Sequence, residues 1–346
     1  MEGYHSPQLD VTIRLNTNEA PEPPPEEFTE RLAAAIRDIA WHRYPNRTAA
    51  ALRARIAEVE GVEADQVFAA NGSNEVLQTV LLTYGGPGRK ALTFEPTYAL
   101  HSHLSRIAGT EVIEGGRTDD FELDLEQVEA LIAEHRPAVT FLCSPNNPTG
   151  RFETEATVRQ VLEWVEAVDG VLIVDEAYGQ FAPWSAKELL GEDRNLVVSR
   201  TYSKTWSMAA VRLGYALAPS WLIAELDKVV LPYHLDATKQ LAGLIALDYL
   251  DDMNARVAAL VEERGRVQVA LDKLPVDHWE SGANFILFRP RTKTGQQVWQ
   301  ELVDRSILVR NCASWPRLDD CLRLTLGTAE ENTAFLAALA EILETS

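Results

Sequence analysis

The stretch SRTYSKTWSMAAVRLGYALA (199–218) places its one lysine, Lys204, among small, hydroxylated and aromatic residues. An apolar run, NLVV, precedes the stretch, and Arg212 follows eight positions after the lysine. Lysine is ordinarily a solvated surface residue. A lysine next to a strand-like run and close to an arginine can instead serve as a nucleophile beside an anion site. The rest of the chain must decide between these two interpretations.

Polar groups also follow the other apolar, strand-like runs of the chain. In chain order they are Ser73 and Asn74 in a small-residue turn that opens a helix, Tyr98, Asn147, Asp175 with Tyr178, Thr201 with Ser203 and Lys204, and Arg212. Ligands of open α/β sheets bind beyond the carboxyl ends of the strands, so we expect these groups to converge. Taken alone, Ser73 would be an ordinary helix cap. A helix N-terminus is, however, also a natural phosphate site.

Together these groups meet the needs of one cofactor, pyridoxal 5′-phosphate (PLP). Its aldehyde takes a lysine, and its pyridine nitrogen takes an acid that keeps it protonated. Its phenolic oxygen takes hydrogen bonds, its ring takes an aromatic neighbour, and its phosphate takes N–H groups, hydroxyls and an arginine. The pattern therefore predicts that Lys204 binds PLP.

Composition limits the remaining possibilities. With 346 residues, 46% hydrophobic and 24% charged, the chain is typical of a soluble globular protein with a large domain and a smaller one. A net charge of −20 argues against nucleic acid as a partner. The start, MEGYHSPQLD, does not resemble a signal peptide, and no apolar run reaches membrane length, so we expect a cytoplasmic protein without membrane contact. The three cysteines, Cys143, Cys312 and Cys321, predict buried reduced thiols and no metal site.

The order of the apolar and amphipathic runs predicts the fold class. From about Gln66, short apolar runs alternate with helical patterns, which predicts a mostly parallel sheet covered by helices. The proline-rich stretch Asn18–Phe28 is expected to be a connector. After about Leu241, one long helical segment precedes three short strands and a last helix, which predicts a smaller α+β domain. We divide the chain into an N-terminal segment (1–40), a large PLP-binding domain (41–241) and a small C-terminal domain (242–346).

Several motifs in order resemble those of the fold-type-I PLP-dependent aminotransferases. They are SPNNPTG, VDEAY, RTYSK, RLGY and CLRLTLGT, and the resemblance runs through nearly the whole chain. Within that superfamily the chain is most similar to the histidinol-phosphate aminotransferases, particularly actinobacterial ones, through RYPNRTAAALR, AANGSNEVLQ, LPYHL and SGANFILFR. The resemblance implies a mostly parallel seven-stranded sheet sandwiched by helices, a smaller α+β domain, and a homodimer with shared active sites. It also implies that the N-terminal segment packs with the small domain and the partner subunit.

The resemblance further implies a role for each site residue. The cofactor contacts would be the Lys204 aldimine, Asp175 at the pyridinium nitrogen, Asn147 and Tyr178 at the phenolic oxygen, Tyr98 on the ring, and Ser73, Asn74, Thr201, Ser203, Arg212 and the partner's Tyr44 at the phosphate. The substrate contacts would be Arg323 at a carboxylate, Arg310 at a second anionic group, Tyr4 and Asn147. Lys204, Asp175 and Tyr178 would carry the catalysis.

The implied reaction is a ping-pong transamination of L-histidinol phosphate with 2-oxoglutarate, a step of histidine biosynthesis. Three alternatives use the same scaffold: an aminotransferase for aromatic, phenylalanine-type amino acids, one of a secondary-metabolite pathway, and a decarboxylase of a phosphorylated amino acid. A ligand sensor attached to a DNA-binding domain would need an additional basic domain, which this acidic sequence does not contain.

Two segments depart from the family pattern. Ala20-Pro21-Glu22 stands where Asn-Pro-Tyr is usual, so Glu22 would place a carboxylate near the substrate if it faced the pocket. After the lysine, Trp206 makes the chain bulkier than expected. We predict that Trp206 packs in the interior and does not contact substrate.

Overall fold

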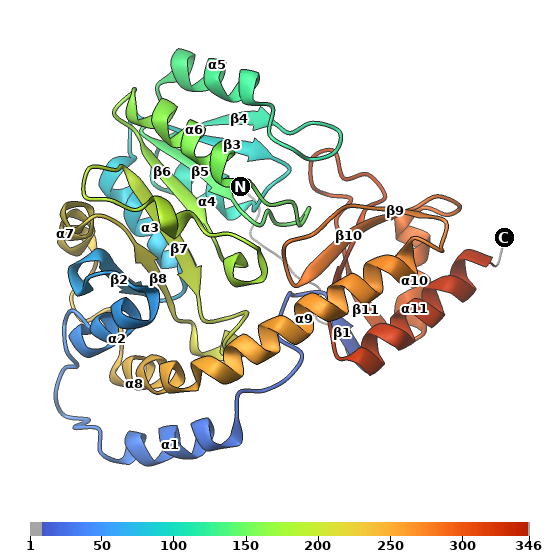
Figure 1. Ribbon diagram of the computed structural model, residues 1–346, viewed down its shortest axis with the longest axis horizontal. Helices are drawn as coiled ribbons and strands as arrows, with labels where there is room; N and C mark the ends of the chain where they lie inside the picture. Colours follow the sequence, from blue (N-terminus) through green and yellow to red (C-terminus); the bar gives the residue numbers. More distant parts are fainter. Residues whose placement is uncertain (1–8, 345–346) are drawn as a thin grey trace.

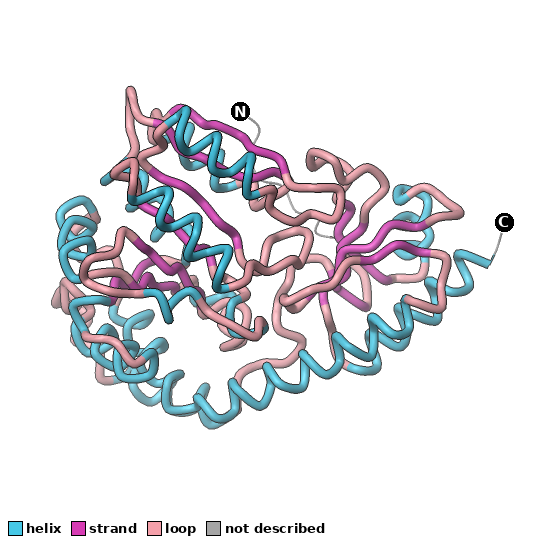
Figure 2. Tube along the Cα trace, turned by 45° about the horizontal axis from the view of Figure 1, so that its top comes forward, coloured by secondary structure: helices cyan, strands magenta, loops and turns pink. Residues whose placement is uncertain are grey.

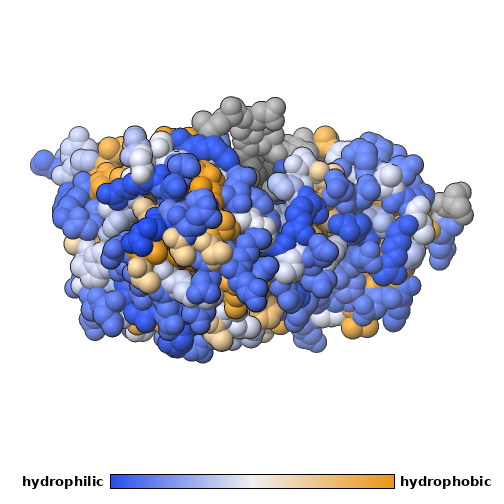
Figure 3. All heavy atoms as spheres, turned by 90° about the horizontal axis from the view of Figure 1, so that it is seen from above, coloured by the Kyte–Doolittle hydropathy of each residue, from blue (hydrophilic) through white to orange (hydrophobic). Residues whose placement is uncertain are grey.

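The computed structural model of the chain describes residues 9–344, which form two β-sheets with helices around them (Figure 1). Polar and charged residues cover most of the face seen from above, with apolar residues in small groups between them (Figure 3). Within the described residues, no helix combines the length and the apolar character needed to cross a membrane.

The larger sheet has seven strands in the order β2-β8-β7-β6-β5-β3-β4. The strands are β2 (Val67–Ala70), β3 (Lys90–Glu95), β4 (Glu111–Gly116), β5 (Val139–Cys143), β6 (Val171–Asp175), β7 (Leu196–Thr201) and β8 (Gly214–Leu217). Only β8 runs antiparallel to its neighbours, β2 and β7. This topology confirms the predicted mostly parallel, seven-stranded sheet.

Helices cover both faces of this sheet. They are α2 (Ala50–Glu60), α3 (Ser73–Tyr84), α4 (Leu100–Ile107), α5 (Leu125–His135), α6 (Glu155–Glu166) and α7 (Ser220–Val229). Side chains alternate between the two faces of a strand, so the fully buried β6 supplies both cores. Leu172 and Val174 pack in the core that includes α6, while Val171 and Ile173 pack in the core that includes α3 and α7. Burial on both faces explains why the central strands read as continuous apolar runs.

The smaller sheet has the order β1-β11-β12-β10-β9. Its strands form a group apart from those of the larger sheet (Figure 2). Its strands are β1 (Ile13–Leu15), β9 (Val276–His278), β10 (Phe285–Pro290), β11 (Ile307–Asn311) and β12 (Leu322–Thr325), and its helices are α9 (Leu250–Leu271), α10 (Gly295–Asp304) and α11 (Ala329–Glu344). Strand β1 pairs in parallel with β11, which joins the start of the described chain to this C-terminal unit. The chain then crosses from β1 to the larger unit past the carboxyl ends of the central strands (Figure 1).

Two element boundaries differ from the sequence-based expectation. Helix α1 (Glu26–Arg37) begins inside the predicted connector, because Pro25 suits the position before the first turn and Glu26 and Glu27 favour the positive end of the helix dipole. The expected single helix after Leu241 is interrupted: α8 (Ala237–Ala246) is followed by a 3₁₀ turn and then by α9. Helix α8 packs on α1 and α2, whereas α9 packs on α11. The division into domains stays a prediction.

The remaining regular elements are short 3₁₀ turns. They comprise Ala64–Gln66, Gly179–Phe181, Ala186–Leu189, Ala209–Val211 and Leu247–Tyr249. The turn at Ala209–Val211 leads directly to Arg212 and β8. Because β8 is antiparallel, its start lies at the same sheet edge as the carboxyl ends of β5, β6 and β7.

Candidate active site

A cavity of about 390 Å³ lies at this sheet edge, and we call it the central cavity. The predicted residues that line it are Ser73, Asn74, Tyr98, Asn147, Asp175, Tyr178, Thr201, Ser203, Lys204, Arg212 and Arg323. The segment after β1 contributes Thr17, Asn18 and Glu19, none of which we had predicted as site residues. Side chains distant in sequence thus converge as expected from the strand ends.

One group of residues in the central cavity has the chemistry of a phosphate site. Helix α3 begins at Ser73, its N-cap is Gly72, and no side chain caps it. Ser73 is therefore not the helix cap. Arg212 Nη1 donates to Ser203 Oγ at 3.1 Å, and Thr201 Oγ1 lies 3.0 Å from the same oxygen. A Cβ added at Gly72 would lie 3.0 Å from Arg212 Nη2, so glycine keeps this corner open. Helix N–H groups, hydroxyls and a guanidinium are the donors that a phosphate requires.

Asp175 ends β6 at the floor of the central cavity and is 1% exposed. Its Oδ2 lies 3.0 Å from His101 Nε2, and its Oδ1 accepts the backbone N–H of Ala177 at 3.2 Å. His101 comes from α4, is fully buried and stacks on Phe141 with ring centroids 4.7 Å apart. A carboxylate fixed in this way can hold a protonated pyridine nitrogen.

Sequence reasoning missed His101. A signal was available, because His101 follows Tyr98 by three positions at the start of a predicted helix, and residues three apart share a helix face. The rings of Tyr98 and His101 lie edge to face, with centroids 5.5 Å apart. Tyr98 itself lines the central cavity, and its hydroxyl donates to Asn74 Oδ1 at 3.3 Å.

Lys204 is partly buried between the two units of the chain. Its Nζ donates to the Thr17 carbonyl oxygen at 3.1 Å and lies 5.9 Å from the centre of the Tyr178 ring. Burial, assisted by the charges of Arg323 and Arg212 and opposed by that of Glu19, lowers the pKa of Lys204 to about 8. A larger share of neutral amine at neutral pH makes this lysine both a nucleophile and a base.

Tyr178 is held by the segment after β1. Its hydroxyl accepts a hydrogen bond from Asn18 Nδ2 at 2.9 Å, and its ring meets Phe285 edge to face at 5.0 Å. Burial strongly raises the pKa of Tyr178, so the side chain stays a neutral phenol that can donate a hydrogen bond.

Arg323 on β12 brings a cation from the smaller sheet into the central cavity. It is 4% exposed, and its guanidinium donates to Asn147 Oδ1 and, at 3.0 Å, to the Asn16 carbonyl oxygen. Arg310 on β11 is its partner in strand register, lies over the Trp315 ring at 5.2 Å, and is not among the residues that line the cavity. The central cavity thus contains two anion-binding groups, Arg212 and Arg323, and both are close enough to Lys204 to lower its pKa.

Comparison with known proteins agrees with this arrangement. The model of the family "Aminotransferase class I and II" matches residues 10–339. The chain belongs to this family. The histidinol-phosphate aminotransferase of Thermobifida fusca is 43% identical over 97% of this chain and 91% of its own length. The histidinol-phosphate aminotransferase of Mycolicibacterium smegmatis is 42% identical over 99% of this chain and 91% of its own length. A solved structure of Sinorhizobium meliloti histidinol-phosphate aminotransferase with pyridoxal-5′-phosphate superposes with a TM-score of 0.87, at 21% identity, over 97% of this chain and 92% of that one.

Tyr44, like Arg310, is a predicted site residue of the aminotransferase that does not line the central cavity. Tyr44 is 80% exposed and stacks on Tyr233, with centroids 4.5 Å apart. It lines a separate cavity beside α1, α2 and α8, and its assignment to the partner's site stays a prediction. Tyr4 falls outside the described residues.

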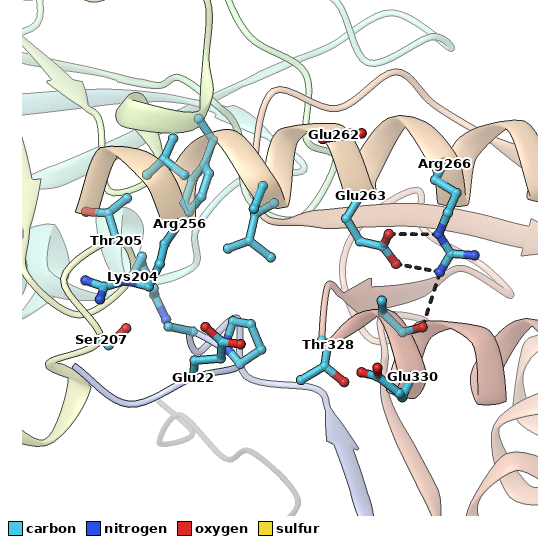
Figure 4. A pocket seen from close by; sticks show the side chains of 18 residues that line it. Glu22, Lys204, Thr205, Ser207, Arg256, Glu262, Glu263, Arg266, Thr328 and Glu330 are labelled. Carbon is cyan, nitrogen blue, oxygen red and sulfur yellow. Dashed lines mark hydrogen bonds and ion pairs between the residues drawn. The ribbon is translucent and has the colours of Figure 1, made fainter. Parts of the chain in front are cut away.

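The two departures from the family pattern face away from the central cavity. Glu22 is exposed and lines a second cavity, of about 530 Å³, between residues 20–22, α9 and the start of α11 (Figure 4). Lys204 lines both cavities, and the ion pair of Glu263 with Arg266 lies farther along α9 (Figure 4). Trp206 is buried and stacks on Tyr202 at 5.5 Å, which confirms that it packs in the interior.

Proposed function

We propose that this aminotransferase uses PLP to transfer the amino group of L-histidinol phosphate to 2-oxoglutarate. The observation that carries the proposal is that Lys204 shares the central cavity with the phosphate-type site at Arg212 and with a second cation, Arg323. A substrate that carries both an amine and an anionic group suits this spacing. The identity of 42–43% with two histidinol-phosphate aminotransferases supports the choice of substrate.

The residues of the central cavity fit PLP. Its phosphate would be held by the α3 N-terminus with Ser73, Asn74, Thr201, Ser203 and Arg212, its pyridine nitrogen by Asp175, its phenolic oxygen by Asn147 and Tyr178, and its ring by Tyr98. When bound there, PLP supplies an electron sink that stabilises a carbanion next to the substrate nitrogen.

Each remaining task falls to a side chain of this protein. Lys204 Nζ removes the proton from the amine-bearing carbon of the amino donor in the first half-reaction. In the second half-reaction it delivers a proton to the corresponding carbon of the acceptor. Its lowered pKa suits this role, because a base must be neutral before it can accept a proton. Asp175, fixed by His101, keeps its charge directed at the ring nitrogen position.

Arg323 binds the anionic group of either substrate. A guanidinium can grip a carboxylate or a phosphate through two parallel hydrogen bonds, so the same residue serves histidinol phosphate and then the carboxylates of 2-oxoglutarate. Arg310, its neighbour on the next strand, would meet the second anionic group if the cavity rearranges around substrate.

The proposal includes a homodimer with shared sites, in the cytoplasm. The exposed large apolar residues of the described chain include Trp41, Tyr44, Leu231 and Tyr233. Tyr44 and Tyr233 stack on each other, so they present one aromatic surface. A second copy that covers this surface would receive Tyr44 at its phosphate site.

A half-reaction tests the substrate. The PLP-loaded protein is mixed with histidinol phosphate, and separately with phenylalanine, while the absorbance of the bound cofactor is followed. We expect rapid conversion to the pyridoxamine form with histidinol phosphate and slow conversion with phenylalanine. Conversion by phenylalanine alone would instead indicate an aromatic aminotransferase, and no conversion by either donor would point to a secondary-metabolite substrate.

A further inference from the structure

Glu19 is a carboxylate in the central cavity to which the proposed transamination assigns no role. Among the residues that line this cavity, the acids are Asp175 and Glu19, and the cations are Lys204, Arg212 and Arg323. Asp175 is buried and already bound by His101 and a backbone N–H. Glu19 is exposed, so it faces the solvent from which substrate arrives.

The segment that carries Glu19 passes both groups that would hold the substrate. The Asn16 carbonyl oxygen accepts from Arg323 at 3.0 Å, and the Thr17 carbonyl oxygen accepts from Lys204 at 3.1 Å. Glu19 follows two residues later on the same wall. An amino donor with its anion at Arg323 and its amine at Lys204 therefore has its third substituent available to Glu19.

The backbone and side chain of this segment are held in place. The Asn18 N–H donates to Thr325 Oγ1 at 2.9 Å, and the Asn18 amide also binds Tyr178. Thr17 Oγ1 donates to Glu19 Oε2 at 2.6 Å, which orients the carboxylate. A fixed anion of this kind can select among substrates, because little freedom is lost when a ligand binds.

We propose that Glu19 is a specificity-determining residue, whose carboxylate accepts a hydrogen bond from the imidazole N–H of the amino donor. This inference rests on the proposed function. The bond strengthens when the imidazole is protonated, since both partners are then charged. A phenyl ring offers no N–H donor, and a carboxylate side chain is repelled, so Glu19 favours an imidazole donor over phenylalanine or glutamate.

The test compares the Glu19→Gln holoenzyme with wild type in half-reactions with histidinol phosphate and with glutamate. We expect kcat/KM for histidinol phosphate to fall about tenfold, the size of one charge-assisted hydrogen bond, while that for glutamate stays the same or rises. Glu22→Gln is the matched control, because Glu22 is an exposed acid three residues away that lines the other cavity. It should change neither reaction. Thr17→Val, which frees the Glu19 carboxylate, should shift selectivity in the same direction by a smaller factor.

Other outcomes overturn the inference in distinguishable ways. An equal loss of kcat/KM for both donors would mean that Glu19 acts through Lys204. An unchanged kcat/KM for both donors would mean that Glu19 does not contact the substrate. In both cases the proposed function survives. If wild-type protein converts glutamate but not histidinol phosphate, the proposed substrate fails and the imidazole contact fails with it.

Discussion

Asp175 Oδ2 lies 3.0 Å from His101 Nε2, and both side chains are buried beneath the central cavity. The histidine comes from α4 and the aspartate from the end of β6, so the contact ties two elements to one point of the site. Stacking on Phe141 fixes the plane of the imidazole ring. The position of the carboxylate thus depends on a residue that does not itself line the cavity.

His101→Phe should preserve the stacking and remove this hydrogen bond. A hydrogen bond to a charged group contributes about 1.5–3 kcal/mol, so we expect the half-reaction to slow by about tenfold or more. The pH at which the bound cofactor changes its absorbance should shift as well, which a purely structural role would not cause. His103→Phe, the same change two positions away on α4, is the control. Unchanged rates and spectra in His101→Phe would contradict this role.

The pKa of Lys204 predicts how the cofactor-free protein reacts with PLP. Only the neutral amine attacks an aldehyde, so the rate should rise with pH through a midpoint at about 8, well below the ordinary 10.5 of lysine. Stopped-flow absorbance over a pH series measures this midpoint. Arg323 lowers this pKa, so Arg323→Met should move the midpoint upward. A midpoint near 10.5 in the wild type would show that Lys204 is not perturbed.

Gly72 allows a sharp test of the phosphate site. Gly72→Ala places a methyl group 3.0 Å from Arg212 Nη2 at a φ of +76°, so PLP affinity should fall. Gly61→Ala is a control for the positive φ alone, because Gly61 has a φ of +75° in the left-handed region and no atom within 4 Å of the added Cβ. Gly72→Ala should cost more folding free energy than Gly61→Ala, because a φ of +76° with a ψ of 167° is a conformation that essentially only glycine adopts. Only Gly72→Ala should weaken PLP binding by the folded protein in an equilibrium titration. Equal PLP affinities in the two variants would place the phosphate elsewhere.

Beneath the site, Arg200 joins two buried acids in one ionic network. Its guanidinium donates to Glu176 Oε2 and to Glu60 Oε1, each at 2.9 Å. Arg200→Met leaves Glu176 without its ion pair and Glu60 paired with Lys187 alone, and we expect the free energy of unfolding to fall by about 3–5 kcal/mol. Arg31→Met removes the exposed ion pair with Asp248 and should cost under about 1 kcal/mol. Chemical denaturation measures the free energy of unfolding of both variants, and equal losses in the two would contradict this prediction.

The same network predicts a dependence of stability on pH. Burial acts to raise the pKa of Glu60, but Arg200, Tyr215 and Lys187 together outweigh it, so the net shift is downward. A lowered pKa in the folded state means that the ionised Glu60 stabilises the protein at neutral pH, and that this contribution disappears as pH falls through the folded-state pKa. The stabilities of wild type and Glu60→Gln should therefore converge between pH 5 and pH 3, at roughly the range where carboxylates titrate. A difference that stays constant over this range would refute the linkage.

The sequence predicts the central sheet and most of the cavity for one physical reason. Buried parallel strands are continuous apolar runs, and the residues that follow them must meet at one edge. Asp175, Thr201 and Lys204 were found in this way. The same reasoning could not show that Thr17, Asn18 and Glu19 line the cavity. Their position depends on the pairing of β1 with β11, which lies almost at the other end of the chain. A three-residue strand carries too little pattern to identify such a partner.

Other features were missed because packing decides them. The interruption between α8 and α9 follows from α8 packing on α1 and α2, which periodicity within the segment does not reveal. The orientation of Glu22 was open, since a sequence does not state which of two adjacent cavities a loop residue faces. The role of His101 could not be predicted for a similar reason. It depends on the contact of His101 with Asp175, which joins α4 to β6.

The central claim is that Lys204 is the lysine that binds PLP. Borohydride reduction of the PLP-loaded protein, followed by digestion and mass spectrometry, locates the modified residue directly. We predict one phosphopyridoxyl group, on the peptide that contains Lys204, and none in the Lys204→Ala variant. Modification of a different lysine in the wild type, or equal labelling of the variant, would contradict the assignment.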